Sequence, residues 1–161
     1  MTVPTYHLLV IDDSRRDVLL LERRLQQAED VVFYITRVET ASAGLKALCT
    51  NCYDLVLMDY DLPDMDGLDF LKAKAQRRLP TPVVLLTTHA QSPLTTAAIQ
   101  LEVLDNFAKD QVNSKLLAKA VKQAIEKSRL QRRAAAEAVR LHALEATVEQ
   151  LKQQLRPLVA S

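Results

Sequence analysis

Four short apolar runs of this 161-residue chain lead into side chains suited to handling a metal ion or a phosphate group. Those side chains are Asp12 and Asp13 after His7–Ile11, Asp59 after Leu55–Met58, Thr87 at the end of Val83–Thr87, and Lys109 after Val103–Ala108. Crowded carboxylates repel one another unless a cation neutralises them, and oxygen ligands suit a hard ion such as Mg²⁺. A lysine adds a positive charge for an anion, and a hydroxyl donates a hydrogen bond to it. Together these groups indicate a phosphoryl-transfer site in which a carboxylate is the nucleophile.

The order of the apolar runs along the chain predicts where these groups lie. The four runs and a fifth, Val31–Val38, alternate with helical patterns, which is typical of an α/β protein with a doubly wound parallel sheet. The helical patterns are the segment after the N-cap candidate Ser14, Ala41–Leu48, the residues after Gly67, and Thr95–Leu101. In such sheets ligands bind at the carboxyl ends of the strands, so we expect the reactive groups to meet at one edge.

These motifs resemble the receiver domain of two-component response regulators over about residues 5–128. The resemblance rests on Asp12 and Asp13, on residues 59–67 (Asp-Tyr-Asp-Leu-Pro-Asp-Met-Asp-Gly), on Thr87 and on Lys109, in that order along the chain. It implies a flavodoxin-like fold with a five-stranded parallel sheet of order 2-1-3-4-5. In this chain an extended C-terminal helix would follow that fold.

The resemblance also implies a role for each site residue. Asp59 would accept a phosphoryl group from a histidine kinase or a phosphotransfer protein. Asp12, Asp13 and Asp59 would hold Mg²⁺ together with the backbone carbonyl of Asp61, and Thr87 and Lys109 would contact the phosphoryl oxygens. Such a domain is a regulatory phosphoacceptor whose only chemistry is self-phosphorylation from a donor and slow self-dephosphorylation.

The chain departs from the family pattern near the fifth strand. Members of the family usually carry an aromatic residue three positions before the lysine, where this chain has Asn106, and proline after the lysine, where it has Asp110. Phe107 cannot replace the missing ring, because successive strand side chains point to opposite faces. The usual coupling of threonine to an aromatic ring is therefore not expected here, and Asp61 and Thr88 beside the site could alter phosphoryl hydrolysis.

The last third of the chain predicts one long helix. Residues 113–127 have the pattern of a final receiver helix, and no Gly or Pro occurs from Asn113 to Arg156. From Leu130 the spacing becomes that of a heptad repeat, with one flaw at Glu137 and an expected break at Pro157. The repeat positions are Leu130, Ala134, Glu137, Leu141, Leu144, Val148, Leu151, Leu155 and Leu158. We expect a receiver domain at 1–128 and a helical extension at 129–161 that forms a homodimeric coiled coil, the alternative being a helix folded back on its own domain.

Composition excludes several other classes of protein. The net charge is +1, the aromatic content is 4%, and no apolar run is long enough to span a membrane, so we expect neither a nucleic-acid platform nor a membrane protein. The N-terminus does not resemble a signal peptide, which favours a cytoplasmic protein. Arg129, Arg132 and Arg133 are better explained as a solvated face than as a DNA contact. The Cys49 and Cys52 pair is expected to be structural, with one thiol packed inward.

Three functions remain open from the sequence. The first is a phosphorylation-controlled switch that relays its state through the C-terminal helix, by dimerisation. The second is the regulatory input fragment of a larger enzyme, such as a diguanylate cyclase. The third is a degenerate receiver-like dimer that acts as a scaffold, which Asn106 and Asp110 would favour and the complete acidic site would disfavour.

Overall fold

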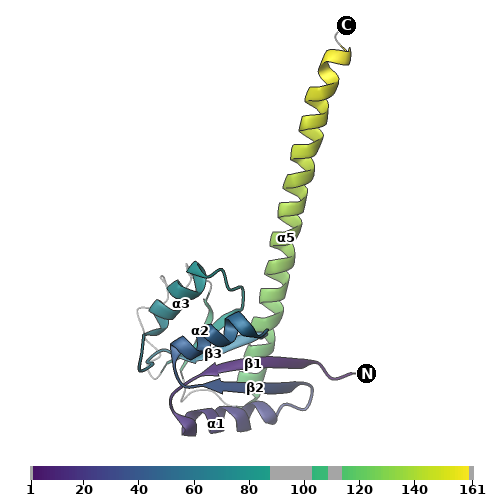
Figure 1. Ribbon diagram of the computed structural model, residues 1–161. Coiled ribbons are helices and arrows are strands. Elements are labelled where there is room, and N and C mark those ends of the chain that lie inside the picture. Colours follow the sequence, from purple (N-terminus) through teal and green to yellow (C-terminus); the bar gives the residue numbers. More distant parts are fainter. Residues whose placement is uncertain (1, 88–102, 109–113, 160–161) are drawn as a thin grey trace. The chain divides into compact units, whose positions relative to one another are not determined.

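The computed structural model in Figure 1 describes residues 2–87, 103–108 and 114–159, with the side chains of residues 87, 103–108 and 114 left aside. Its strands are β1 (Thr5–Ile11), β2 (Val32–Val38), β3 (Leu55–Asp59), β4 (Val83–Thr87) and β5 (Val103–Ala108). Its helices are α1 (Arg15–Gln26), α2 (Ala41–Thr50), α3 (Gly67–Gln76) and α5 (Ser114–Val159). The helix expected at Thr95–Leu101 lies outside the described residues.

The strands form a parallel sheet of order β2-β1-β3-β4-β5. β3 is buried along its whole length, and β1 is buried over its last four residues, because both faces of the sheet are covered. This burial explains why the two central strands are continuous apolar runs in the sequence. The expected α/β fold, with a parallel sheet and a long C-terminal helix, is confirmed.

The helices pack on the two faces of the sheet, and successive side chains of each strand point alternately to one face and the other. Leu8 and Val10 of β1 join the core under α1 and residues 114–125 of α5, whereas Leu9 and Ile11 join the core under α2 and α3. Figure 1 shows α1 on the face of the sheet opposite α2 and α3. The residues at the carboxyl ends of the strands are thus held by packing from both sides.

α1 begins as its sequence predicts. The Ser14 hydroxyl accepts a hydrogen bond from the backbone N–H of Asp17 at 3.3 Å, which caps the first turn. This cap starts the helix immediately after Asp12 and Asp13. The two carboxylates therefore lie in a short, well-defined connection between a buried strand and a capped helix.

α5 is one continuous helix of 46 residues. The chain consists of two compact units, residues 1–125 and 126–161, and α5 contributes to both. The break expected at Pro157 is wrong, since the helix continues through it to Val159. Proline removes one backbone donor and crowds the carbonyl four residues earlier, but here only two helical residues follow it, so the loss is confined to the last turn. Among the described residues, no helix combines the length and the apolar character needed to cross a membrane.

The expectation that one cysteine packs inward is also wrong, because Cys49 and Cys52 are both exposed free thiols. α2 buries Leu45 and Leu48 against the sheet, and Cys49 lies one residue further round the helix. Cys52 lies beyond the helix end. The two cysteines therefore lie on either side of the end of α2, and neither thiol is in the core.

Candidate functional site

Three carboxylates meet at the carboxyl ends of β1 and β3. Oxygen atoms of Asp12, Asp13 and Asp59 all lie within 4.8 Å of one another. Asp12 is 2% exposed and Asp59 is 8% exposed, whereas Asp13 is exposed. The cluster is therefore held in the fold on one side and open to water on the other. An arrangement of this kind fits Mg²⁺, which binds a few carboxylates and retains water ligands.

The register of the sheet produces this cluster. β1 and β3 are parallel neighbours, and Ile11 pairs with Met58, so that Asp12, directly after β1, lies beside Asp59, the last residue of β3. The N–H of Asp12 donates to the Val38 carbonyl at 3.1 Å, which continues the pairing of β1 with β2. The Asp12 carboxylate in turn accepts the N–H of Ser14 at 2.9 Å. Both the backbone and the side chain of Asp12 are thus fixed by local hydrogen bonds.

Arg37, near the end of β2, holds the connection that carries Asp12 and Asp13. Its Nε donates to the Asp12 carbonyl at 3.3 Å, and its second terminal nitrogen donates to the Asp13 carbonyl at 3.1 Å. The remaining terminal nitrogen pairs with the Glu39 carboxylate at 3.0 Å. A planar guanidinium can make these three contacts at once, which a lysine cannot. No motif in the sequence singles out Arg37 for this role.

We expect Arg37→Lys to lower the affinity for Mg²⁺ by about tenfold, as for other residues that orient metal ligands. The substitution keeps the positive charge, so a change reports the lost hydrogen-bond geometry and not the Coulomb interaction with the metal. A Mg²⁺ titration followed by amide NMR shifts near residues 12–14 measures it, with Arg23→Lys on α1 as the control. An unchanged affinity in Arg37→Lys would show that the carbonyl contacts do not order the site.

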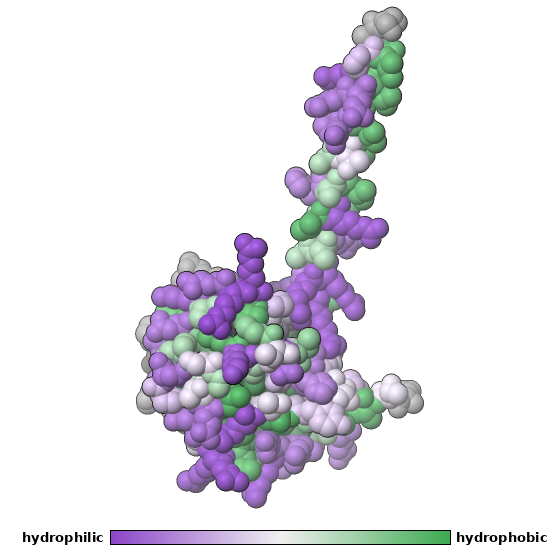
Figure 2. Space-filling view, viewed as in Figure 1, coloured by the Kyte–Doolittle hydropathy of each residue, from purple (hydrophilic) through white to green (hydrophobic). Residues whose placement is uncertain are grey.

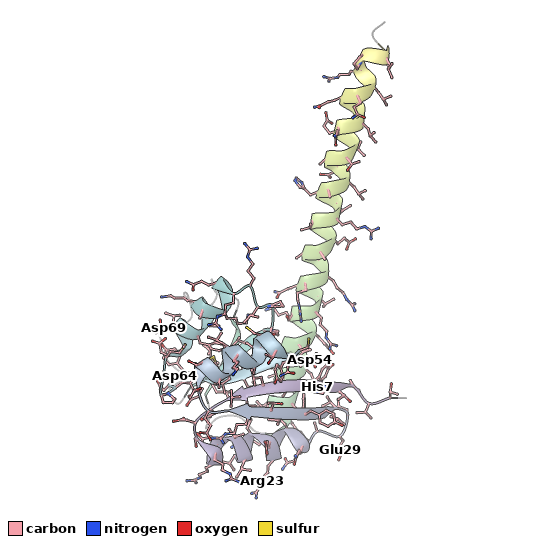
Figure 3. The ribbon with its side chains drawn as sticks, viewed as in Figure 1. His7, Arg23, Glu29, Asp54, Asp64 and Asp69 are labelled. Carbon is pink, nitrogen blue, oxygen red and sulfur yellow. The ribbon has the colours of Figure 1, made fainter. Side chains whose placement is uncertain are left out.

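Asp64 attaches the loop after Asp59 to the start of α2. One carboxylate oxygen accepts the N–H of Ala41 at 2.9 Å, and the other accepts the N–H and the hydroxyl of Ser42 at 2.9 and 2.8 Å. Figure 3 shows Asp64 beside α2, where the unpaired N–H groups and the dipole of the helix favour a negative charge. Partial burial alone would raise the pKa of Asp64, but the hydrogen bonds from Ser42 and Ala41 outweigh it and hold the pKa below its usual value.

This lowered pKa gives Asp64 a defined pH dependence. Since the folded-state pKa is below the unfolded value of 3.8, the stability that Asp64 adds is complete above that value and is lost as the pH falls through the folded-state pKa. We expect Asp64→Ala to be less stable than the wild type by about 1 kcal/mol at neutral pH, as for the loss of a helix cap. Urea unfolding between neutral pH and pH 3 should show the difference shrinking only in the acid range. A difference that is constant with pH would contradict the role of the carboxylate.

Hydrogen bonds within residues 60–67 hold the rest of this loop together. Asp61 forms an isolated β-bridge with Asp66, and the N–H of Gly67 donates to the Tyr60 carbonyl at 2.9 Å. A Cβ on Gly67 would lie 2.7 Å from the Tyr60 ring, so glycine permits this close approach. Burial, followed by the charges of Asp66, Asp61 and Asp69, raises the pKa of Tyr60. The phenol beside Asp59 is therefore neutral at physiological pH.

Other predicted site residues are described only in part. Thr87 ends β4, where its backbone pairs with Ala108, and its side chain is not described. Asn106 and Phe107 lie in β5 opposite Leu85 and Leu86. Lys109, Thr88 and Asp110 lie outside the described residues, so their expected roles remain predictions.

The comparisons with known proteins agree with this geometry. A family model described as the response regulator receiver domain matches residues 8–122, and the chain therefore belongs to that family. Receiver domains are regulatory phosphoacceptors that bind Mg²⁺ at an acidic pocket and take phosphoryl groups from histidine kinases or phosphotransfer proteins.

Individual relatives support the same assignment. The chain is 31% identical over 118 residues to the sensor histidine kinase GacS of Pseudomonas protegens, covering 70% of this chain and 12% of GacS. It is 33% identical over 123 residues to the transcriptional regulatory protein GlrR of Escherichia coli K12, covering 76% of this chain and 27% of GlrR. A solved signal receiver domain from Vibrio parahaemolyticus is 25% identical, with a TM-score of 0.70, covering 81% of this chain and 97% of that one. In eight curated relatives the chain spans between 12% and 58% of the relative's length.

Proposed function

We propose that this protein is a phosphorylation-controlled switch that accepts a phosphoryl group on Asp59 and relays its state through α5. The observation that carries the proposal is the cluster of Asp12, Asp13 and Asp59 at adjacent strand ends of a receiver fold. Asp59 is the proposed nucleophile because it comes from the central strand β3, between the Asp12–Asp13 connection and the end of β4. This position lets groups from several elements reach one phosphoryl group.

The proposed reaction moves one phosphoryl group between two side chains. A carboxylate oxygen of Asp59 attacks the phosphorus of a phosphohistidine, the phosphorus–nitrogen bond breaks, and its electron pair remains on the imidazole. Water later attacks the acyl phosphate, which regenerates the carboxylate and releases inorganic phosphate. Asp12, Asp13, Asp59 and the Asp61 carbonyl would hold Mg²⁺, which when bound neutralises negative charge as the phosphoryl group approaches. Thr87 and Lys109 would bind the phosphoryl oxygens.

A recess beside Asp12 supports docking of the donor on α1. It is lined by Asp12, by Asp17, Leu20, Leu21 and Arg24 of α1, by Leu86 of β4 and by Leu117 of α5. Leu19 and Leu20 of α1 are 49% and 41% exposed, so the apolar surface continues outside the recess. A mainly apolar surface next to a reactive group suits a helix that presents a phosphohistidine to Asp59.

The relay is proposed to pass through α5 because this helix belongs to both units of the chain. Its residues 117, 121 and 125 are part of the sheet core, and its later residues carry the heptad repeat. A change at the strand ends that moved α5 would alter how two copies of the helix pair. Dimerisation would then be the output of the switch.

A second candidate is a receiver that regulates a longer protein. The observation in its favour is that the matched relatives are longer than the shared receiver region. One of them is a protein-glutamate methylesterase, so receiver regions occur in chains that also carry enzymes. In that case α5 would connect the receiver to the regulated part.

The test of the proposed function is phosphorylation by a small-molecule donor. We expect the protein incubated with acetyl phosphate and Mg²⁺ to gain the mass of one phosphoryl group, and hydroxylamine to remove it, as an acyl phosphate requires. A chelator should prevent the gain, and excess Mg²⁺ should restore it. Intact-mass spectrometry measures all four results. A protein that remains folded and gains no phosphoryl group at millimolar Mg²⁺ would contradict the proposal.

A further inference from the structure

The part of α5 after residue 126 carries a stripe of exposed apolar side chains. Seven large apolar residues of the heptad repeat are 49% to 72% exposed in the single chain, namely Leu130, Leu141, Leu144, Val148, Leu151, Leu155 and Leu158. Figure 2 shows hydrophobic residues gathered along one side of this part of the helix, with hydrophilic residues beside them. Together with Ala134 and Glu137 these positions are spaced alternately four and three residues apart, which is typical of the narrow seam of a coiled coil.

We infer that a second copy of this helix covers the stripe, running parallel and in register. The inference rests on the dimerisation in the proposed function and adds the orientation, which that function leaves open. In the heptad, Leu130 occupies a d position and Ala134 the following a position. The charged residues that flank the seam then decide between parallel and antiparallel pairing.

In a parallel dimer, residues at g face residues at e five positions later on the other helix. Arg140 occupies a g position and Glu145 an e position, so Arg140 faces Glu145 of the partner subunit. The two-fold symmetry forms this pair twice. The other flanking pairs combine a neutral residue with a neutral or charged one, as in Thr147 with Lys152 of the partner subunit. No like-charge pair flanks the seam in this arrangement.

Antiparallel pairing lacks this complementarity in its two longest overlaps. One of them sets Glu145 against Glu145 of the partner subunit, and the other forms no ion pair and buries Glu137 against Val148 of the partner subunit. A shorter overlap does pair Glu145 with Lys152 of the partner subunit. It leaves Leu130, Ala134 and Glu137 uncovered, so it exposes Glu137 to water but loses the apolar burial of Leu130 and Ala134 in exchange for two surface ion pairs.

Parallel pairing has one unfavourable layer, at Glu137. This residue occupies a d position and would face its own copy, but Arg133 and Arg140 lie one helical turn away on either side. These two cations reduce the repulsion between the carboxylates. Val148 at an a position, between Leu144 and Leu151 at d positions, is the combination that favours two strands over three or four. The seam therefore specifies a parallel dimer that is weaker near Glu137 than near Leu151.

Disulfide trapping tests the orientation in the full chain. Cys49→Ser and Cys52→Ser first remove the two exposed native thiols, and Leu141→Cys or Leu155→Cys is then added singly. In a glutathione redox buffer, where oxidised glutathione takes up the electrons, both variants should form covalent dimers. The cysteine of each variant faces its own copy only in the parallel arrangement. Val139→Cys, outside the seam, is the matched control and should form far fewer.

The oligomeric state and the cross-linking yield together distinguish a failure of dimerisation from a failure of the parallel orientation alone. If sedimentation equilibrium shows a monomer, the dimerisation in the proposed function fails and the inference fails with it. If it shows a dimer but Leu141→Cys and Leu155→Cys cross-link no better than Val139→Cys, only the orientation is overturned. We also expect Arg140→Glu to weaken the dimer on the order of threefold to tenfold and Glu145→Arg to restore it when added. A double variant as weak as the single one would contradict the Arg140–Glu145 pair.

Discussion

Asp59→Asn should abolish phosphoryl uptake from acetyl phosphate, because an amide oxygen cannot form the acyl phosphate. Asp69→Asn should leave uptake unchanged, since Asp69 lies in the first turn of α3, outside the carboxylate cluster. Intact-mass spectrometry after a fixed incubation with Mg²⁺ measures both variants. Residual uptake in Asp59→Asn would mean that another side chain is the acceptor.

The same variant gives a control for folding. Without Mg²⁺, three carboxylates within 4.8 Å repel one another, so removing one charge should stabilise the fold. We expect Asp59→Asn to raise the free energy of unfolding by roughly 1 to 3 kcal/mol in the presence of a chelator. Millimolar Mg²⁺ should reduce this difference, because the wild type gains more from the cation. A variant that is less stable than the wild type under both conditions would show that Asp59 has a structural role. The loss of phosphoryl uptake in Asp59→Asn would then not identify Asp59 as the acceptor.

Leu144→Lys combined with Leu151→Lys should convert the dimer to a monomer. Both leucines occupy d positions in the best part of the seam, and each substitution places two like charges at the centre of a coiled coil. The dissociation constant should rise by at least about 100-fold, as expected for two lost core layers of about 1.4 kcal/mol or more each. The helical circular dichroism should also fall, because a long amphipathic helix is marginal without a partner.

Val139→Lys is the matched control for this prediction. Val139 is also apolar and is 71% exposed, but its heptad position lies on the side of the helix away from the seam. It should leave the dimer intact. Equal weakening by Val139→Lys and by the double variant would contradict the heptad assignment, and analytical ultracentrifugation distinguishes the two cases.

The core of this fold is readable from the sequence because buried parallel strands are continuous apolar runs. The ends of β1 and β3 were predictable for that reason, and parallel pairing then brings Asp12, Asp13 and Asp59 together at one edge. The N-cap at Ser14 was readable from its own side chain and its place before a helical pattern.

The contacts of Arg37 and Asp64 were not readable in the same way. Arg37 reaches carbonyl groups 24 and 25 residues away, and only the three-dimensional position of β2 beside β1 provides that contact. Asp64 belongs to a recognisable motif, but its partners at the start of α2 lie 22 and 23 residues away. The two errors were local, at the thiols of Cys49 and Cys52 and at Pro157. In each case the position within or just beyond a helix decided the outcome more than the residue type.

The central claim is that phosphorylation at Asp59 controls pairing through α5. Sedimentation velocity with and without Mg²⁺ plus beryllofluoride, repeated on Asp59→Asn, tests it most directly, since beryllofluoride stands in for the phosphoryl group. We predict that the wild type shifts toward the dimer when beryllofluoride binds and that Asp59→Asn does not shift. An identical distribution with and without beryllofluoride, in a protein shown by NMR to bind it, would contradict the claim and make the helix a constitutive pairing element.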